Sequence, residues 1–503
     1  MSGVTLGAEA LAIGDVVAIA RGRRAVSLAE SARDHMLRSR AVVERFTRED
    51  RPVYGLTRGL GGRVVNEIGK ESRAGYSRVV VLARACGAEP YLPSEAVRAA
   101  LVARASSMAQ GGAGVRPLIV DTQCAMLNAG VHPLVPSIGS AGASDLALLA
   151  NMALPVIGEG RAELNGEILS GAEAMARAGI ATVDPQEKEG LALCSANSIS
   201  AGLGALVLHD ATHLAELADA IAVLSFEAFR ANPSPIDPRV VRARAAPGQA
   251  RAAMSLRQKL AGSRLFETGE PRRVQDPISL RCVSHVHGSL RAAIDFCAPN
   301  VLIELNGAGD NPLVLAEDDE ILSTGNFHTP AMAVAFDALA LAISQVATIG
   351  AQRIARMMKG EFTDLPDGLS RHGTTHAGVA LMSLTSEVLS KEIHMKAQPA
   401  SLFDSMGYPV EDHAPNTLAT VRKAGEALTL LQQILACELI ASAQAFDLRE
   451  PAEAAPVARA LRNRVREAVA FVDEDRSLTV DLATVAALVR DGAFEPCLEA
   501  ANA

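Results

Sequence analysis

The sequence predicts a mainly α-helical protein, with a long central helical bundle and a smaller mixed N-terminal domain. After about residue 185, apolar residues recur at helical spacing in stretches that are too long for strands and that end at Pro or Gly. Before that point the periods are shorter and Gly and Pro are more frequent. We therefore expect an N-terminal mixed domain over 1–185 and a long-helix bundle domain over 186–503.

The elements follow from local patterns. Alternation predicts short strands at residues 4–6, 163–164 and 167–169. From Val421 onward, Leu428, Leu431, Leu435 and Leu439 keep one helical face apolar, and a proline at 451 follows the end of the pattern. Similar Ala- and Leu-rich stretches predict further long helices over 198–230, 284–300, 329–358 and 376–396.

Composition excludes several classes of protein. The chain has 503 residues, 49% of them hydrophobic and 21% charged, with a formal net charge of −9 and no dense Lys/Arg run. We expect no nucleic-acid or membrane partner. Glu9 and Asp15 interrupt the first apolar stretch, which makes a poor secretory signal, so a cytoplasmic protein is expected. Asp337 interrupts the longest apolar segment, which favours a bundle helix over a membrane span. Seven cysteines without a CxxC pair fit reduced thiols.

Two histidine pairs resemble metal ligands. His209 and His213 share a helical face, but no Glu follows the first His and no third ligand is evident. His285 and His287 are spaced by two, which does not make them neighbours on a helix. The glycine clusters TRGLGG and AQGGAG lack the spacing of a phosphate loop. We therefore expect no metal site.

A set of motifs in a fixed order is more specific. The motifs are YGLTRGLG from Tyr54, VPSIGSAGASDLALLANMAL from Val135, EGLALCSANSIS from Glu189, VQDPISLRC from Val274, DNPLV from Asp310, STGNFH from Ser323 and VEDH from Val410. In sequence and order the chain resembles the histidine and phenylalanine ammonia-lyase superfamily over nearly its whole length. The resemblance implies a mostly helical fold, a small amino-acid substrate, and a homotetramer whose active sites are each assembled from three subunits.

This superfamily eliminates the α-amino group and a β-proton with the help of a methylidene-imidazolone, an electrophile cyclised from its own Ala-Ser-Gly. Here the motif reads Ala143, Ser144 and Asp145, and the cyclising glycine is gone. A branched, charged residue disfavours a closure for which glycine provides the backbone freedom. We expect this degenerate motif to stay unmodified, and therefore expect no cofactor.

The resemblance also implies roles for individual residues. It makes Tyr54, on a lid loop over 50–65, the catalytic base and Arg281 the clamp for the substrate carboxylate, and it places Ser144 in the catalytic motif. Three positions depart from the family pattern: Arg84 replaces a ring-holding His, Ser195 an Asn, and Ile278 a Tyr. The remaining positions expected to bind substrate are Gln275, Asn326, Phe327 and Glu411, with Lys391 or Lys396 as a further cation.

These residues predict a carbon–nitrogen lyase. Since the base and the carboxylate clamp are retained while the electrophile is expected to be lost, the favoured substrate is a betaine with an imidazole-like side chain, which releases trimethylamine and gives an α,β-unsaturated acid. The trimethylamine-releasing lyase that acts on ergothioneine is a superfamily branch of this kind. Two alternatives stay open: a conventional ammonia-lyase that makes its ring despite Asp145, and a catalytically silent relative with a binding or assembly role.

Overall fold

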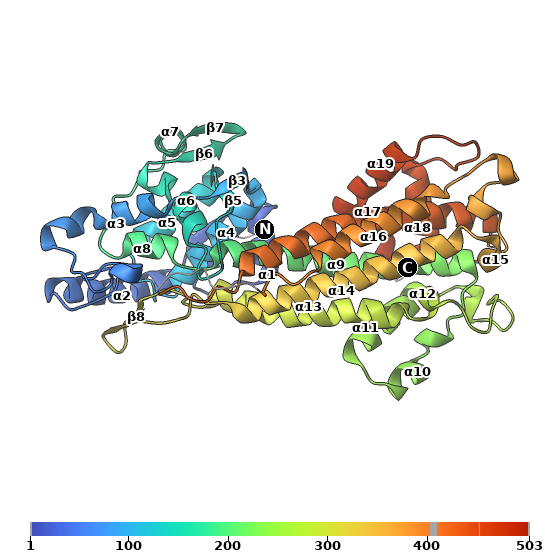
Figure 1. The fold of residues 1–503 in the computed structure, drawn as a ribbon, viewed down its shortest axis with the longest axis horizontal. Coiled ribbons are helices and arrows are strands. Elements are labelled where there is room, and N and C mark those ends of the chain that lie inside the picture. Colours follow the sequence, from blue (N-terminus) through green and yellow to red (C-terminus); the bar gives the residue numbers. More distant parts are fainter. Residues whose placement is uncertain (1–2, 403–409, 452, 501–503) are drawn as a thin grey trace. The chain divides into compact units, whose positions relative to one another are not determined.

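A computed structural model describes residues 3–402, 410–451 and 453–500 (Figure 1). Helices make up 61% of the structure and strands 7%, which confirms the predicted fold class. The chain forms two compact units: the first comprises Met1–His209, Cys297–Phe336 and Pro399–Arg422, and the second Asp210–Phe296, Asp337–Gln398 and Lys423–Ala503. The division predicted at residue 185 remains a prediction.

The first unit mixes short helices with small sheets. Strands β1 and β2, β3 and β5, and β8 and β9 form two-stranded sheets. Strands β4, β6 and β7 form a three-stranded sheet. Its elements are β1 (Val4–Leu6), α1 (Ile13–Ala20), β2 (Val26–Leu28), α2 (Glu30–Arg48), α3 (Lys70–Arg84), β3 (Ala88–Tyr91), α4 (Ser94–Ala109), α5 (Pro117–Ala129), β4 (Val131–Pro133), β5 (Pro136–Ile138), α6 (Leu146–Ala153), β6 (Arg161–Leu164), β7 (Glu167–Ser170), α7 (Gly171–Arg177), α8 (Glu189–Cys194), β8 (Leu313–Leu315) and β9 (Glu320–Leu322).

Four long helices contribute residues to both units, and the second unit adds shorter helices of its own. The long helices are α9 (Ser198–Phe229), α13 (Val283–Asn306), α14 (Pro330–Met357) and α17 (Thr417–Arg449). The others are α10 (Pro238–Ala243), α11 (Pro247–Lys259), α12 (Ile278–Arg281), α15 (Gly360–Thr363), α16 (Leu381–Lys396), α18 (Pro456–Ala468), α19 (Thr479–Arg490) and α20 (Glu495–Glu499).

Helix α17 confirms the predicted core helix. Leu428, Leu431, Leu435 and Leu439 are all at most 3% exposed, so the periodic face is the buried one. Each such leucine contributes about 1.5–3 kcal/mol by leaving water. The helix ends two residues before the proline at 451, as the pattern predicted.

The predicted strands are present, but most of the other short strands were not predicted from the sequence. Residues 163–164 and 167–169 lie in the hairpin of β6 and β7, where Leu164 pairs with Glu167. Asn165 and Gly166 form its two-residue turn with φ of 53° and 83°, the left-handed values that such a turn requires.

The helix predicted over 376–396 begins later, at Leu381. The carboxylate of Asp475 accepts the backbone N–H groups of Ala377 and Gly378 at 2.8 and 2.9 Å. Gly378 has a φ of 57°, which a helix cannot continue. The preceding loop is therefore held by a side chain 97 residues away, a contact that local periodicity does not reveal.

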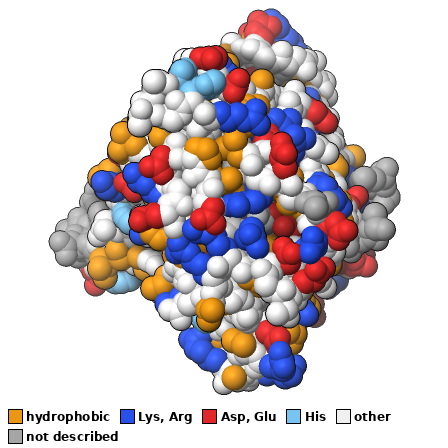
Figure 2. All heavy atoms as spheres, turned by 90° about the vertical axis from the view of Figure 1, so that its right-hand side faces the viewer, with side chains coloured by type: hydrophobic (Ala, Val, Ile, Leu, Met, Phe, Trp, Pro, Cys, Tyr) orange, Lys and Arg blue, Asp and Glu red, His pale blue; other side chains and the backbone are white. Residues whose placement is uncertain are grey.

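Three helical segments are long and apolar enough to cross a membrane by length and composition, but each is largely buried inside the structure. The apolar windows of Glu189–Phe229, Pro330–Met357 and Thr417–Arg449 are 89%, 72% and 67% buried, which supports a packed helical core. On the face shown in Figure 2, Lys and Arg side chains alternate with Asp and Glu rather than gathering in one patch.

Candidate active site

The motif at Ala143–Asp145 forms a tight turn between β5 and α6 in the first unit. Ser144 has a φ of 69°, in the left-handed region that side chains other than glycine seldom adopt. Its N–H donates to the carbonyl of Phe327 at 3.2 Å, and its hydroxyl donates to the carbonyl of Ala196 at 3.0 Å. A β-carbon on Gly142 would lie 2.7 Å from a backbone nitrogen of α17. The turn is thus fixed by chain segments that are distant in sequence.

Asp145 is fully buried, and its carboxylate lies at the N-terminus of α9. One oxygen accepts the hydroxyls of Ser140 and Ser200 at 2.8 and 3.0 Å, and the other accepts the N–H of Ser200 at 2.8 Å. Burial raises the pKa of Asp145, and the hydrogen bonds from Ser200 and Ser140 oppose that rise. The free N–H groups and the dipole of a helix N-terminus favour an anion at this position.

The lid loop brings two of the predicted residues together. The phenol oxygen of Tyr54 accepts the N–H of Gly61 at 3.0 Å. A β-carbon on Gly61 would lie 3.4 Å from Oε1 of Glu411, so the expected base and the expected ring-binding carboxylate flank one glycine. Gly55 has a φ of 68°, and a β-carbon there would come within 2.5 Å of a methyl group of Leu191. The glycines therefore let the loop pack directly on α8.

Arg84 is the last residue of α3, and its charge acts on the same region. Burial raises the pKa of Tyr76, the charge of Arg84 lowers it, and Tyr54 raises it further. Burial raises the pKa of the Cys194 thiol to about 12, and Arg84 again opposes the rise. Arg84 thus lies within electrostatic reach of a neighbour of the lid tyrosine and of the residue that precedes Ser195.

Ser195 is 8% exposed and follows α8, but the neighbouring Asn197 makes the stronger contact. The amide nitrogen of Asn197 donates to the carbonyl of Phe327 at 2.6 Å, the same oxygen that accepts from Ser144. Its amide oxygen is buried and has no hydrogen-bond partner among the described residues. Sequence reasoning missed this residue, although an asparagine two positions after the substituted one was a usable signal.

The STGNFH and VEDH motifs meet in the first unit. Nε2 of His328 lies 2.7 Å from Nδ1 of His413, and burial lowers the pKa of His328. Asn326 is exposed and donates from its amide to the carbonyl of Ala308 at 3.3 Å, while Phe327 is half-buried. The adjacency of the two motifs supports one site built from both.

Four of the predicted residues belong to the second unit. Arg281 ends α12, and its Nε is buried without a hydrogen-bond partner among the described residues. Gln275 and Lys391 are exposed. Lys396 forms an ion pair with Glu426 at 2.5 Å, which leaves Lys391 as the better candidate for an uncommitted cation.

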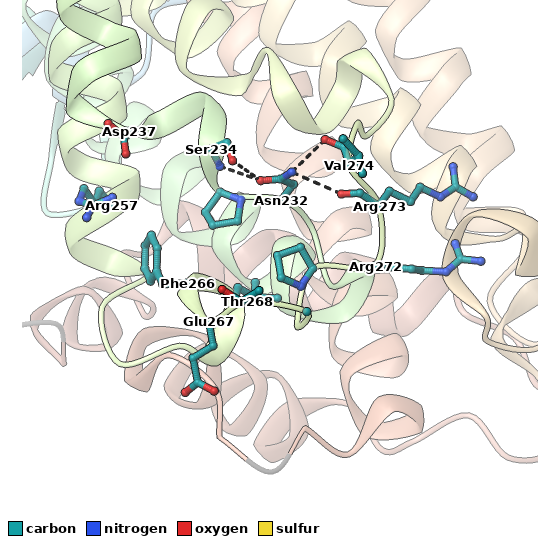
Figure 3. A pocket seen from close by; sticks show the side chains of 14 residues that line it. Asn232, Ser234, Asp237, Arg257, Phe266, Glu267, Thr268, Arg272, Arg273 and Val274 are labelled. Atoms are coloured by element: carbon teal, nitrogen blue, oxygen red, sulfur yellow. Dashed lines mark hydrogen bonds between the residues drawn. The ribbon is translucent and has the colours of Figure 1, made fainter.

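A cavity of about 520 Å³ in the second unit lies beside the loop that precedes Gln275 (Figure 3). Asn232 accepts the hydroxyl of Ser234 at 2.6 Å and donates to the carbonyl of Val274 at 2.9 Å. Figure 3 shows the guanidinium groups of Arg272 and Arg273 directed away from the cavity. The polar groups that line the cavity thus hold the loop in place.

The two histidine pairs do not form a metal cluster. His287 is buried, and its Nδ1 lies 2.7 Å from the carboxylate of Asp219. Among the described residues, no three His, Cys, Asp or Glu side chains are grouped to hold a metal ion. All seven cysteines are free thiols.

Known proteins match the chain over nearly its full length. A histidine ammonia-lyase from Symbiobacterium thermophilum is 40% identical over 503 residues, covering 99% of both chains. Among solved structures, the ergothioneine-degrading enzyme ergothionase from Treponema denticola, in complex with desmethyl-ergothioneine sulfonic acid, has a TM-score of 0.94 at 28% identity, covering 98% of this chain and 99% of the other. A histidine ammonia-lyase from Trypanosoma cruzi has a TM-score of 0.91 at 28% identity, covering 99% and 95%.

The expectation of a chain without a cofactor is wrong. Its 40%-identical relative is named a histidine ammonia-lyase, an activity that uses a methylidene-imidazolone formed from the chain itself. The residues present fit such a group, because Ala143–Asp145 already form a tight turn and the Asp145 side chain is bound to Ser140 and Ser200. Crowding by the side chain at position 145 was expected to prevent closure, but Ser200 at the start of α9 binds the Asp145 carboxylate.

The match to a family model is equally extensive. The model described as aromatic amino acid lyase covers residues 11–467, and the turn, the lid and the paired STGNFH and VEDH motifs all lie within it. Homologues with this architecture are carbon–nitrogen lyases. The chain therefore belongs to the aromatic amino acid lyase family and is a carbon–nitrogen lyase.

Proposed function

We propose that this chain eliminates the α-amine from an amino acid or betaine with an imidazole-like side chain, giving the α,β-unsaturated acid. The observation that carries the proposal is the pairing of Tyr54 and Glu411 across Gly61 in the first unit. A phenol that serves as a base and a carboxylate that can bind an imidazole N–H are suited to one substrate whose ring is attached to the reacting β-carbon.

In this mechanism Tyr54 removes the β-proton while Arg281 holds the substrate carboxylate through two parallel N–H bonds. Glu411 binds the ring, and Arg84 stabilises negative charge on it. Ser195, Gln275, Asn326, Phe327 and Lys391 complete the proposed substrate pocket. Ala143, Ser144 and Asp145 would hold the methylidene-imidazolone, which supplies an electrophile that turns the amine into a better leaving group.

The proposed mechanism also uses residues of the second unit, namely Arg281, Gln275 and Lys391. The family resemblance supports a homotetramer in which each active site takes residues from three subunits. A cytoplasmic location and small-molecule partners complete this proposal.

The leaving group separates two candidate functions. The first is ammonia release from an imidazole-bearing amino acid, supported by the 40%-identical histidine ammonia-lyase. The second is trimethylamine release from a betaine, supported by the likeness to ergothionase and by Arg84 and Ser195, which both depart from the family pattern.

The test offers paired substrates to the purified chain: histidine, its Nα-trimethyl betaine, and the 2-thioimidazole analogue of each. The unsaturated acid is followed by ultraviolet absorbance, and ammonia and trimethylamine are measured separately. Faster turnover of the amine supports the first function, and faster turnover of the betaine supports the second. No turnover of any of the four would reject the proposal and favour a silent relative.

A further inference from the structure

Ser144 is held by two carbonyl groups that belong to segments distant in sequence. Its hydroxyl donates to the carbonyl of Ala196 at 3.0 Å, and its N–H donates to the carbonyl of Phe327 at 3.2 Å. The first carbonyl lies in segment 192–197, which runs from the last turn of α8 toward α9, and the second lies in segment 323–328, the STGNFH motif. The position of the turn therefore depends on the spacing between these two segments.

One buried ion pair joins the two segments. The side chains of Arg104 on α4 and Asp310 of the DNPLV motif are 0% and 1% exposed, and Nη2 of the arginine lies 2.7 Å from Oδ1 of the aspartate. Nη1 donates to the other carboxylate oxygen at 3.4 Å, and Nε donates to the carbonyl of Ala192 at 3.1 Å. That carbonyl lies in the last turn of α8, where a helix leaves its carbonyls without helical partners. The guanidinium therefore satisfies the end of α8 and the Asp310 carboxylate at once.

Segment 323–328 is bonded to the backbone around Asp310. The carbonyl of Asp310 accepts the hydroxyl of Thr324 at 3.1 Å, and the side-chain oxygen of Asn311 accepts the N–H of Thr324 at 2.9 Å. The Thr324 hydroxyl also accepts the N–H of Asn326 at 3.3 Å, one residue before the carbonyl that holds the turn. Hydrogen bonds therefore run without a break from the end of α8 through the ion pair to this segment.

The geometry of the pair is better suited to positioning than to stability alone. An ion pair that is buried this deeply adds little net stability over apolar side chains of the same size, because both charges lose their water. A planar guanidinium, however, bonds a carboxylate and a carbonyl at the same time in fixed directions. Asn197 links the same two segments close to the turn, since its amide donates to the carbonyl of Phe327 at 2.6 Å. The ion pair adds a second, buried link to this one.

We propose that Arg104 and Asp310 are positioning residues, which set the spacing between the two carbonyl-bearing segments and so hold the Ala143–Asp145 turn in place for the reaction. Neither residue contacts the substrate in the mechanism above. Their effect on turnover rests on the proposed function, whereas the contacts themselves exist without substrate.

Hydrogen exchange tests the link directly. The N–H of Ser200 donates to the Asp145 carboxylate on the turn, and the N–H of Thr324 donates to Asn311. Arg104→Lys keeps the buried charge but loses the planar fork. Exchange at both amides should speed up by about tenfold, because the segments that carry them can then open locally.

Arg353→Lys is the matched control, because it makes the same change in the fully buried pair of Arg353 with Glu438 in the second unit. Both variants should lose stability, but only Arg104→Lys should speed exchange at Ser200 and Thr324. Equal exchange at these amides in the two variants would overturn the proposal.

Thr324→Val tests the same link and serves also if Arg104→Lys does not fold. It removes the hydroxyl that joins Asp310 to Asn326 and leaves the buried charges in place. Exchange at Ser200 should again be faster than in wild type. With a substrate that is turned over, kcat should fall by about tenfold or more, because the turn is displaced from the reacting bonds. KM should stay within about threefold, because the groups that bind the substrate are unchanged.

Thr122→Val is the control for this variant, because the hydroxyl of Thr122 donates to the carbonyl of Leu118 inside α5. A kcat for Thr324→Val no lower than that of the control, with no faster exchange at Ser200, would contradict the positioning role. Wild type that turns over none of the four substrates would reject the proposed lyase activity, whereas exchange at Ser200 would still decide whether the ion pair holds the turn.

Discussion

The turn at Ala143–Asp145 and the helical core of the second unit hold their buried acidic side chains in different ways. In the second unit Glu438 is fully buried, and its carboxylate accepts hydrogen bonds from Nε and Nη2 of Arg353 at 2.7 and 2.9 Å. Asp219 there is paired with Arg291 at 2.8 Å. At the turn, Asp145 accepts hydrogen bonds from the hydroxyls of Ser140 and Ser200 and from the N–H of Ser200, and no arginine or lysine among the described residues forms an ion pair with it.

The comparison distinguishes buried acids that have an arginine partner from a buried acid that is held only by neutral hydrogen-bond donors. An acid that is paired with a buried arginine has its charge compensated at close range, and removal of the arginine leaves a buried charge without a partner. An acid held by neutral donors alone has no neighbouring cation to offset the effect of burial, which raises the pKa. Burial raises the pKa of Asp145, which lies in the predicted catalytic turn, where perturbed acids are expected in an enzyme.

Breaking the arginine pair should have the largest effect on stability. Arg353→Met leaves the Glu438 carboxylate buried without its cation, which should lower the free energy of unfolding by about 3–5 kcal/mol. Denaturant titration measures the loss. The double variant with Arg353→Met and Glu438→Leu should recover much of the lost stability. A loss below about 1 kcal/mol in the single variant would show that the Glu438 carboxylate does not depend on Arg353.

A matched pair of serine variants sharpens the comparison. Ser200 donates to Asp145 at 3.0 Å and Ser225 donates to Glu438 at 2.7 Å. Ser200→Ala should lower the free energy of unfolding by about 1.5–3 kcal/mol, since an acid without a cation loses a charge-assisted bond. Ser225→Ala should lose about 0.5–1.5 kcal/mol, because the arginine still satisfies the carboxylate. Equal losses by chemical denaturation would remove the distinction between Asp145 and Glu438.

The smallest expected effect is the acid sensitivity of His287. Burial lowers its pKa and Asp219 opposes this, so the folded chain binds fewer protons here than the unfolded chain. Stability should therefore fall as pH drops through about 6.5, the ordinary histidine value. His287→Asn should lose less Tm between pH 7 and pH 5.5 than wild type does. An identical slope would place the acid sensitivity elsewhere.

Sequence patterns predicted the long helices because each depends on its own residues. The leucines of α17 at helical spacing are buried as expected. The late start of α16 could not be predicted, because it depends on the Asp475 carboxylate almost one hundred residues away. The motif order likewise predicted the family, while no local pattern predicts a β8–β9 pair of three-residue strands.

The site was predicted residue by residue but not as a network. Tyr54 and Glu411 are 357 positions apart, and only the motifs linked them. The consequence of Asp145 was misjudged because its side chain was considered alone, without the N–H groups of α9.

The most direct test of the proposed lyase activity compares wild type with Tyr54→Phe on histidine and on its Nα-trimethyl betaine. Wild type should convert at least one of them to the unsaturated acid, with one equivalent of ammonia or trimethylamine. Tyr54→Phe should keep its secondary structure and Tm while kcat falls by a factor on the order of 10² to 10⁴, the usual contribution of a positioned base. Turnover by Tyr54→Phe at the wild-type rate, or no unsaturated acid from either substrate with wild type, would contradict the account.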